Sequence, residues 1–174
     1  MNPQPSSPAW PGPGPMCGHG LRRTAPPPRP QVHIGGWVRR PAALEAQALE
    51  AMGAEDVPGF VVRCTLDGAH GGPRPMRGVP LRRLIEHAEP AFGERTDFKR
   101  TAVVAESADG YRALFSWGEL FHTQVGEGVY LAFDCARAPL DAHTAPFALL
   151  SLHDTHTGPR FVRQLASVDL HRLW

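Results

Sequence analysis

The chain has 174 residues, 42% of them hydrophobic, and its 18 basic residues nearly balance 17 acidic ones. This predicts one globular domain with a substantial core, and a formal charge of +1 provides no general attraction for nucleic acid or a membrane surface. We therefore expect neither nucleic acid nor a membrane as a partner. No stretch approaches the roughly 18 apolar residues of a membrane span, and no secretory leader is recognisable. The chain as written is expected to be soluble and cytoplasmic, or periplasmic if an export leader is missing from it.

Residues 1–30 differ in composition from the rest of the chain. They hold ten of the 19 prolines, interspersed with glycines. Because proline removes backbone donors and glycine raises the entropy cost of ordering, we predict a disordered tail here. It is either a solvated extension or a docking segment for a proline-reading partner. Residues 31–174 are predicted to form the domain.

The first half of the domain consists of short apolar runs separated by turn residues. A strand is predicted over Val32–Val38, and a helix from Pro41 that Gly53 ends. A second strand is expected over Phe60–Leu66, and the glycines and prolines of residues 67–78 predict a loop. The next helix has one apolar face, made by Leu81, Leu84, Ile85 and Ala88.

The second half is richer in strands. Two strand-like runs flank Asp109-Gly110, a pair typical of a tight hairpin turn. Further strands are predicted over residues 128–135, 147–152 and 161–170. Strands outnumber helices and are joined mostly by turns. The fold class is therefore α+β, with mixed sheets or a barrel-like β core and a few short helices.

Several short motifs occur in a particular order. GWVRRPAAL is followed by a strand that ends in Cys64, by the helix start GVPL at Gly78, by the hairpin ADGYRALFSWGEL, and by the closing segment GPRFVRQLASVDL. In this order the chain resembles the sulfite oxidase family, also called the oxidoreductase molybdopterin-binding domain. The resemblance covers most of residues 32–170 and implies a short, stand-alone member with the sulfite-oxidase-type molybdopterin-binding fold.

The resemblance also implies a cofactor and a metal ligand. Cys64 lies about where the family places the cysteine whose thiolate binds molybdenum, so we expect it to be the catalytic residue and the ligand of the molybdenum cofactor, molybdopterin. A soft thiolate suits such a metal. Alternatively, Cys64 is a small buried core residue. The nearby basic residues are candidates for binding the pterin cofactor or a small anionic ligand: Arg63, His70, Arg74 and Arg77.

A second group of candidates lies near the C-terminus. Within the resemblance this segment approaches the cofactor side, so its basic residues are candidate cofactor contacts: His153, His156, Arg160 and Arg163. A separate hypothesis is a metal site built on His153 and His156, although HxxH needs a third ligand and no zincin-type glutamate accompanies it.

Two functions follow as hypotheses. The first is a molybdopterin-dependent oxidoreductase domain that transfers an oxygen atom to or from a small oxyanion or sulfoxide, with a possible redox partner protein. The second is a cofactor-free binding or accessory domain that keeps the fold without catalysis. Two departures from the family favour the second. Ala148 stands where the family often has an arginine that faces the cofactor or substrate, and a proline-rich segment stands where larger members have residues that contact the pterin.

Overall fold

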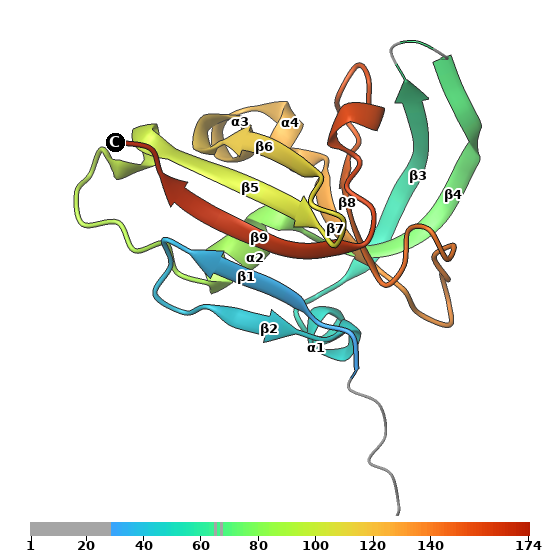
Figure 1. The fold of residues 1–174 in the computed structure, drawn as a ribbon, viewed down its shortest axis with the longest axis horizontal. Coiled ribbons are helices and arrows are strands. Elements are labelled where there is room, and N and C mark those ends of the chain that lie inside the picture. The colour runs from blue at the N-terminus through green and yellow to red at the C-terminus, as the bar shows by residue number, and fades with distance from the viewer. Residues whose placement is uncertain (1–28, 65, 67) are drawn as a thin grey trace, which may run out of the picture.

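The computed structural model of this chain describes residues 29–64, 66 and 68–174. The predicted tail therefore lies outside the described residues, apart from its last two positions. The described part folds into two β-sheets with short helices around them (Figure 1). The predicted α+β class is confirmed. None of the helices in this part of the chain is long and apolar enough to cross a membrane.

The first sheet has five strands in the order β2-β1-β9-β5-β6. Its strands are β1 (Val32–Gly36), β2 (Ala42–Leu44), β5 (Thr101–Ser107), β6 (Arg112–Ser116) and β9 (Leu165–Arg172). β9 runs parallel to β1 and antiparallel to β5. The last strand of the chain thus lies in the middle of this sheet and joins the first strand to the hairpin of β5 and β6 at the other edge.

The second sheet has four antiparallel strands in the order β3-β4-β7-β8. They are β3 (Glu55–Cys64), β4 (Gly68–Pro80), β7 (Val129–Phe133) and β8 (Phe147–Ser151). β3 and β4 form a long hairpin that extends beyond the other strands (Figure 1). This hairpin forms one wall of the groove described below.

The helices are short. They are α1 (Ala46–Ala51), α2 (Leu81–His87), α3 (Trp117–His122) and α4 (Gln124–Glu127), with 3-10 turns at Asp97–Arg100 and Gly158–Arg160. α2 has the predicted apolar face, with Leu81, Leu84 and Ile85 buried. α3 begins with a capping box, in which the Ser116 hydroxyl accepts from the Glu119 N–H and the Glu119 carboxylate accepts from the Ser116 N–H.

Apolar side chains cover both faces of β7 and β8. Leu131 and Leu149 face the main core between the sheets, whereas Ala132 and Ala148 belong to a second apolar cluster on the opposite face. Because both faces are buried, these strands are continuous apolar runs rather than alternating ones. The second cluster forms the floor of the groove.

Several predicted elements differ from the structure. The strand predicted over residues 161–170 begins only at Leu165. Residues 42–44 form strand β2 on the edge of β1, so the helix begins only at Ala46. β3 begins at Glu55, five residues before the predicted start. The segment predicted as a loop is strand β4. Its prolines are tolerated because the β3–β4 ladder has register shifts on either side of Phe60, and bulges of this kind accommodate residues that cannot donate a hydrogen bond.

The predicted hairpin is present between β5 and β6. Gly110 adopts a φ of 88° and donates from its N–H to the Ser107 carbonyl. The Asp109 carboxylate accepts from the Ser107 hydroxyl and the Tyr111 N–H, and these bonds hold its pKa below the usual value. The Asp109 carboxylate is therefore hydrogen-bonded within the hairpin turn itself.

Candidate functional site

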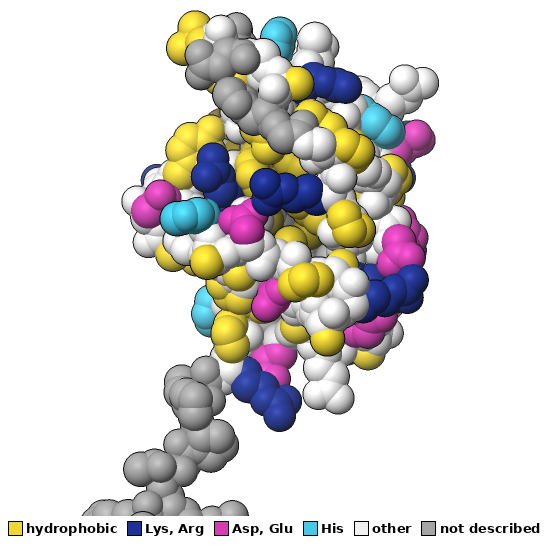
Figure 2. Space-filling view, turned by 90° about the vertical axis from the view of Figure 1, so that its right-hand side faces the viewer, with side chains coloured by type: hydrophobic (Ala, Val, Ile, Leu, Met, Phe, Trp, Pro, Cys, Tyr) yellow, Lys and Arg dark blue, Asp and Glu magenta, His cyan; other side chains and the backbone are white. Residues whose placement is uncertain are grey.

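A groove lies between the β3–β4 hairpin and the two segments that precede and follow β8. Its apolar half has a volume of about 540 Å³. Figure 2 shows this face of the molecule, hollowed and with basic side chains beside the hollow. The residues that line this half are Phe60, Val62, Gly72, Arg74, Met76, Asp141, His143, Thr144, Phe161 and Arg163.

The polar half of the groove has a volume of about 570 Å³. It shares His143, Phe161 and Arg163 with the apolar half, so the two halves are continuous. The further residues that line it are Ser107, Asp109, Tyr111, Gly158 and Gln164. Together the halves run from the β3–β4 hairpin to the turn between β5 and β6. Such dimensions are typical of sites for small organic ligands.

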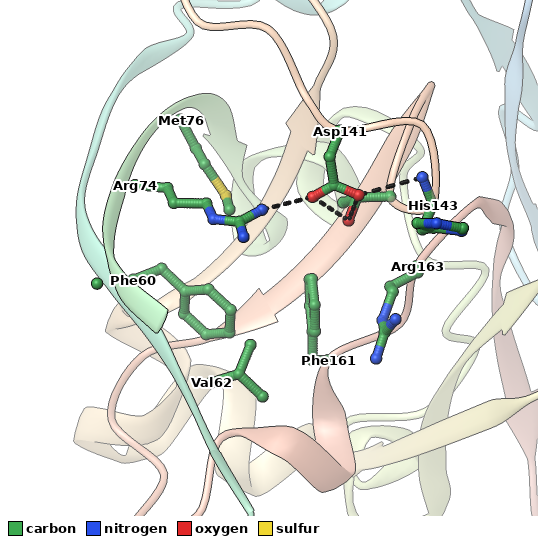
Figure 3. Close-up of a pocket in the computed structure, with 10 residues that line it drawn as sticks. Phe60, Val62, Arg74, Met76, Asp141, His143, Phe161 and Arg163 are labelled. Atoms are coloured by element: carbon green, nitrogen blue, oxygen red, sulfur yellow. Dashed lines mark hydrogen bonds and ion pairs between the residues drawn. The ribbon is translucent and has the colours of Figure 1, made fainter. Parts of the chain in front are cut away.

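An ion pair stands at the edge of the apolar half. Arg74 donates to the Asp141 carboxylate at 2.6 Å, and both side chains are partly exposed (Figure 3). Burial by itself would raise the pKa of Asp141, but the Thr144 hydroxyl, the His143 N–H and Arg74 outweigh it and lower that pKa. Asp141 is thus an ionised group whose oxygens already have donors.

Two aromatic side chains form part of the floor of the groove. The rings of Phe60 and Phe161 pack with centroids 5.1 Å apart, and the Arg163 guanidinium lies 5.4 Å from the centre of the Phe161 ring. Figure 3 shows Arg163 beside Phe161, across the hollow from the Arg74–Asp141 pair. Arg163 is exposed and has no carboxylate partner among residues 29–64, 66 and 68–174. Within the described part of the chain, Arg163 is thus a groove cation without a carboxylate partner.

The segment from Leu152 to Gln164 is held in place by specific hydrogen bonds. Thr157 is 2% exposed, and its hydroxyl donates to the Val61 carbonyl at 2.7 Å and accepts from the Arg63 N–H at 2.8 Å. On the other side the Tyr111 hydroxyl donates to the Pro159 carbonyl at 2.5 Å. These bonds join the end of β3 to the hairpin of β5 and β6 through the 157–159 turn.

Cys64 lies beside the groove: it is not among the lining residues of either half, but it neighbours two of them, Val62 and Gly158. It is the last residue of β3, is half-buried, and is a free cysteine. Val62, which lines the groove, lies two residues before it in a regular stretch of the β3–β4 ladder, so strand alternation places both side chains on the same face of the sheet. A Cβ added at Gly158 would lie 3.7 Å from the Cα of Cys64, which makes this glycine its close neighbour.

The predicted basic candidates are distributed over several places. Arg74 and Arg163 line the groove. Arg63 is exposed at the end of β3, next to Cys64. His70 pairs with Val62 through the backbone, and its side chain lies outside the described structure.

Arg77 and Arg160 are bound by carboxylates of the same chain. Arg77 pairs with Glu50 at 2.5 Å and with Asp56 at 3.2 Å, and these hydrogen bonds raise the pKa of its guanidinium. Arg160 binds Asp154 and Glu119 and lies over the Phe115 ring. Burial lowers the pKa of Arg160, but the two carboxylates outweigh it and the net change is upward. Neither arginine lines the groove.

The two histidine candidates do not form a metal site with each other. His153 is hydrogen-bonded through Nδ1 to the Gln124 carbonyl at 2.6 Å, and His156 is exposed. In the described part of the chain, no group of three or more His, Cys, Asp or Glu side chains is placed to hold a metal ion. The hypothesis of a metal site on these histidines therefore has no third ligand there.

Some groove residues were not predicted. His143 and Tyr111 reach the groove from segments remote in sequence, and Phe60, Met76 and Phe161 look like ordinary core residues in the sequence. Only the proximity of Phe161 to Arg160 and Arg163 within the GPRFVRQL segment could have indicated one of them. Ala148, which stands where the family often has an arginine, is fully buried in the second apolar cluster.

Comparisons with known proteins bear on the fold. No protein-family model matches the chain, and no curated protein matches it. Among solved structures, the sulfane dehydrogenase SoxCD from Paracoccus pantotrophus is similar, with a TM-score of 0.59 and 18% sequence identity. The match covers 82% of this chain and 38% of the SoxCD chain, so this chain spans well under half of that one. The likeness supports the expected sulfite-oxidase-type α+β fold, and at this identity it concerns the fold alone.

Proposed function

We propose that this chain is a molybdopterin-dependent oxidoreductase domain whose cofactor and substrate share the groove. The observation that carries the proposal is the place of Cys64, beside the groove and on the same strand face as Val62. The order of sulfite-oxidase-like motifs and the fold likeness to SoxCD, a sulfane dehydrogenase, support the same reaction class.

The residues of this chain fit two requirements of such a cofactor. A soft metal needs a thiolate, which Cys64 would supply, and the anionic end of the pterin needs a cation, which Arg163 would supply. Gly158 lines the polar half without a side chain, and a Cβ there would lie 3.1 Å from the Arg63 carbonyl oxygen and 3.7 Å from the Cα of Cys64. When bound, the cofactor would supply the exchange of two electrons and an oxygen atom with the substrate. Phe161 and Phe60 would exclude water from one side of the groove, and His143 would face the bound anion.

A second candidate function is binding without a cofactor. Three observations favour it. Ala148 is buried where the family often has an arginine, and both Arg77 and Arg160 are neutralised by carboxylates of this chain. In this version the groove binds a small anionic ligand through Arg163 and Arg74, and Cys64 is only a packing residue.

Metal and pterin content separate the two functions. The full chain, produced in a host that makes the cofactor, is expected to carry about one molybdenum and one pterin per molecule. Cys64→Ser should lose the metal, whereas Cys135→Ser, which alters the other half-buried cysteine, should keep it. Well-folded protein without molybdenum or pterin would reject the oxidoreductase and leave the cofactor-free function.

Thiol labelling gives an independent readout. In a variant with Cys17 and Cys135 replaced by serine, the oxidoreductase predicts that Cys64 reacts in cofactor-free protein and is protected in loaded protein. A packing cysteine would react slowly in both preparations.

A further inference from the structure

The apolar half of the groove is larger and more hydrophobic than a simple oxyanion requires. Its floor contains Phe60 and Met76, which are 3% and 6% exposed, together with the half-buried Val62 and Phe161. A sulfite-sized anion would fill a small part of the volume of about 540 Å³ and would gain nothing from these side chains. The floor suits an apolar ring or chain.

The edge of the same half carries an excess of positive charge. Arg74 and Arg163 stand on opposite sides of the floor, with Asp141 as the one carboxylate among the lining residues (Figure 3). Arg74 donates to Asp141 through Nη1 and is 61% exposed, so the rest of its guanidinium is open to a ligand. The oxygens of Asp141 also accept from Thr144 and the His143 N–H. Two guanidinium groups therefore stand against one carboxylate that is already engaged.

From this arrangement we propose that the apolar half binds an organic anion that combines an apolar ring with an acidic group. The ring lies on Phe60, Met76 and Phe161, and the acidic group lies between Arg74 and Arg163. Arg163 lines both halves of the groove, so its guanidinium would be shared with the cofactor when one is bound. Aromatic walls favour a ring, and guanidinium groups favour a carboxylate, sulfonate or phosphate. The inference deepens the proposed function by naming the class of its substrate. It rests on that function only for catalysis, because this binding requires no cofactor.

Two dyes of matched shape test the inference. 1-Anilinonaphthalene-8-sulfonate carries a ring system and a sulfonate, and N-phenyl-1-naphthylamine has the same rings without the charge. With full-length protein from a host that cannot make the cofactor, we expect saturable binding of one sulfonate dye per chain. Sulfate in tenfold excess, at constant ionic strength, should not displace it.

The variants assign the binding to this groove. Arg74→Ala and Arg163→Ala should each lower the affinity for the sulfonate dye about tenfold, because each removes a charge-assisted contact. The affinity for the neutral dye should change by less than about twofold. Asp141→Asn should raise the affinity for the sulfonate dye, because it removes the competing negative charge. The amide oxygen would still accept from Thr144 and the His143 N–H. Phe161→Ala should weaken both dyes.

The control is Arg40→Ala, which removes an exposed arginine that pairs with Glu89 away from the groove and should change neither dye. If Phe161→Ala does not fold, Phe161→Leu tests the contribution of the same aromatic ring. Absence of saturable binding, or equal loss of affinity in Arg40→Ala and Arg163→Ala, would overturn the inference. Molybdenum content plays no part in these outcomes, so failure here is distinct from failure of the proposed function.

Discussion

The Thr157 hydroxyl donates a hydrogen bond of 2.7 Å to the carbonyl of Val61 and so ties the turn that carries Gly158 to the end of β3. Thr157 is 2% exposed, and the same hydroxyl accepts from the Arg63 N–H. A buried hydroxyl from a distant segment thus helps, together with the β3–β4 ladder, to fix the end of β3 that carries Cys64.

Replacing Thr157 by valine should loosen this connection. The change keeps the shape of the side chain and leaves the partly buried Val61 carbonyl and Arg63 N–H without this partner, so we expect a loss of about 1–2 kcal/mol in the free energy of unfolding. Urea denaturation measures it. Labelling of Cys64 should also become faster. Thr155→Val is the matched control, because Thr155 is exposed two residues away, and an equal effect there would contradict the assignment.

Arg160 should contribute to stability rather than to ligand binding. It joins Asp154 after β8 to Glu119 at the start of α3, and its side chain is 21% exposed. Arg160→Gln should lower the free energy of unfolding by about 1–2 kcal/mol, since it leaves a half-buried carboxylate unpaired. Arg112→Gln breaks a more exposed pair with Glu106 and should lower the free energy of unfolding by much less, because solvent screens that pair. Chemical denaturation of both variants, with the dye titration alongside, distinguishes stability from binding.

Gly36 should tolerate no side chain. Its φ is 77°, and a Cβ there would lie 2.2 Å from the Leu170 carbonyl oxygen, which belongs to the neighbouring strand β9. Gly110 has a similar φ of 88° but open space around it. We expect Gly110→Ala to cost about 1–2 kcal/mol from the left-handed backbone alone, and Gly36→Ala to cost at least about 3 kcal/mol. Thermal melts compare the two, and equal losses would show that β9 can move away from β1.

Asp97 should make the stability depend on pH. The Glu94 N–H, the Gly93 N–H and Arg100 outweigh burial and lower the pKa of its carboxyl group. Because this pKa is lower in the folded protein than in the unfolded chain, the stabilisation is present above the usual carboxyl value. It should be lost as the pH falls below about 4. Urea unfolding between pH 6 and pH 3 should show a smaller decline for Asp97→Asn than for the wild type. Glu86→Gln, which alters an exposed carboxylate on α2, should decline as the wild type does.

The elements that local rules govern could be predicted. The apolar face of α2 follows from the spacing of Leu81, Leu84 and Ile85, and the hairpin follows from Asp109-Gly110, because helix periodicity and turn geometry depend on near neighbours in the chain. Cys64 and Arg163 could be named because each lies in a short motif that resembles a family. Their roles stay predictions, which the metal analysis and the dye titration would test.

The features that could not be predicted from local sequence depend on pairing between distant segments of the chain. Residues 67–78 were predicted to form a loop, yet residues 68–80 form strand β4, because β3 and β7 supply hydrogen-bond partners on its two sides. Arg77 and Arg160 were predicted to be free to bind a ligand. In the structure Arg77 forms ion pairs with Glu50 and Asp56, and Arg160 forms ion pairs with Asp154 and Glu119. The sequence by itself determined the α+β class, the helix faces and the tight turn, which arise within a few residues of chain. Only the tertiary structure decided which arginines keep a free charge and which apolar side chains line a groove, because both depend on what the folded chain places beside them.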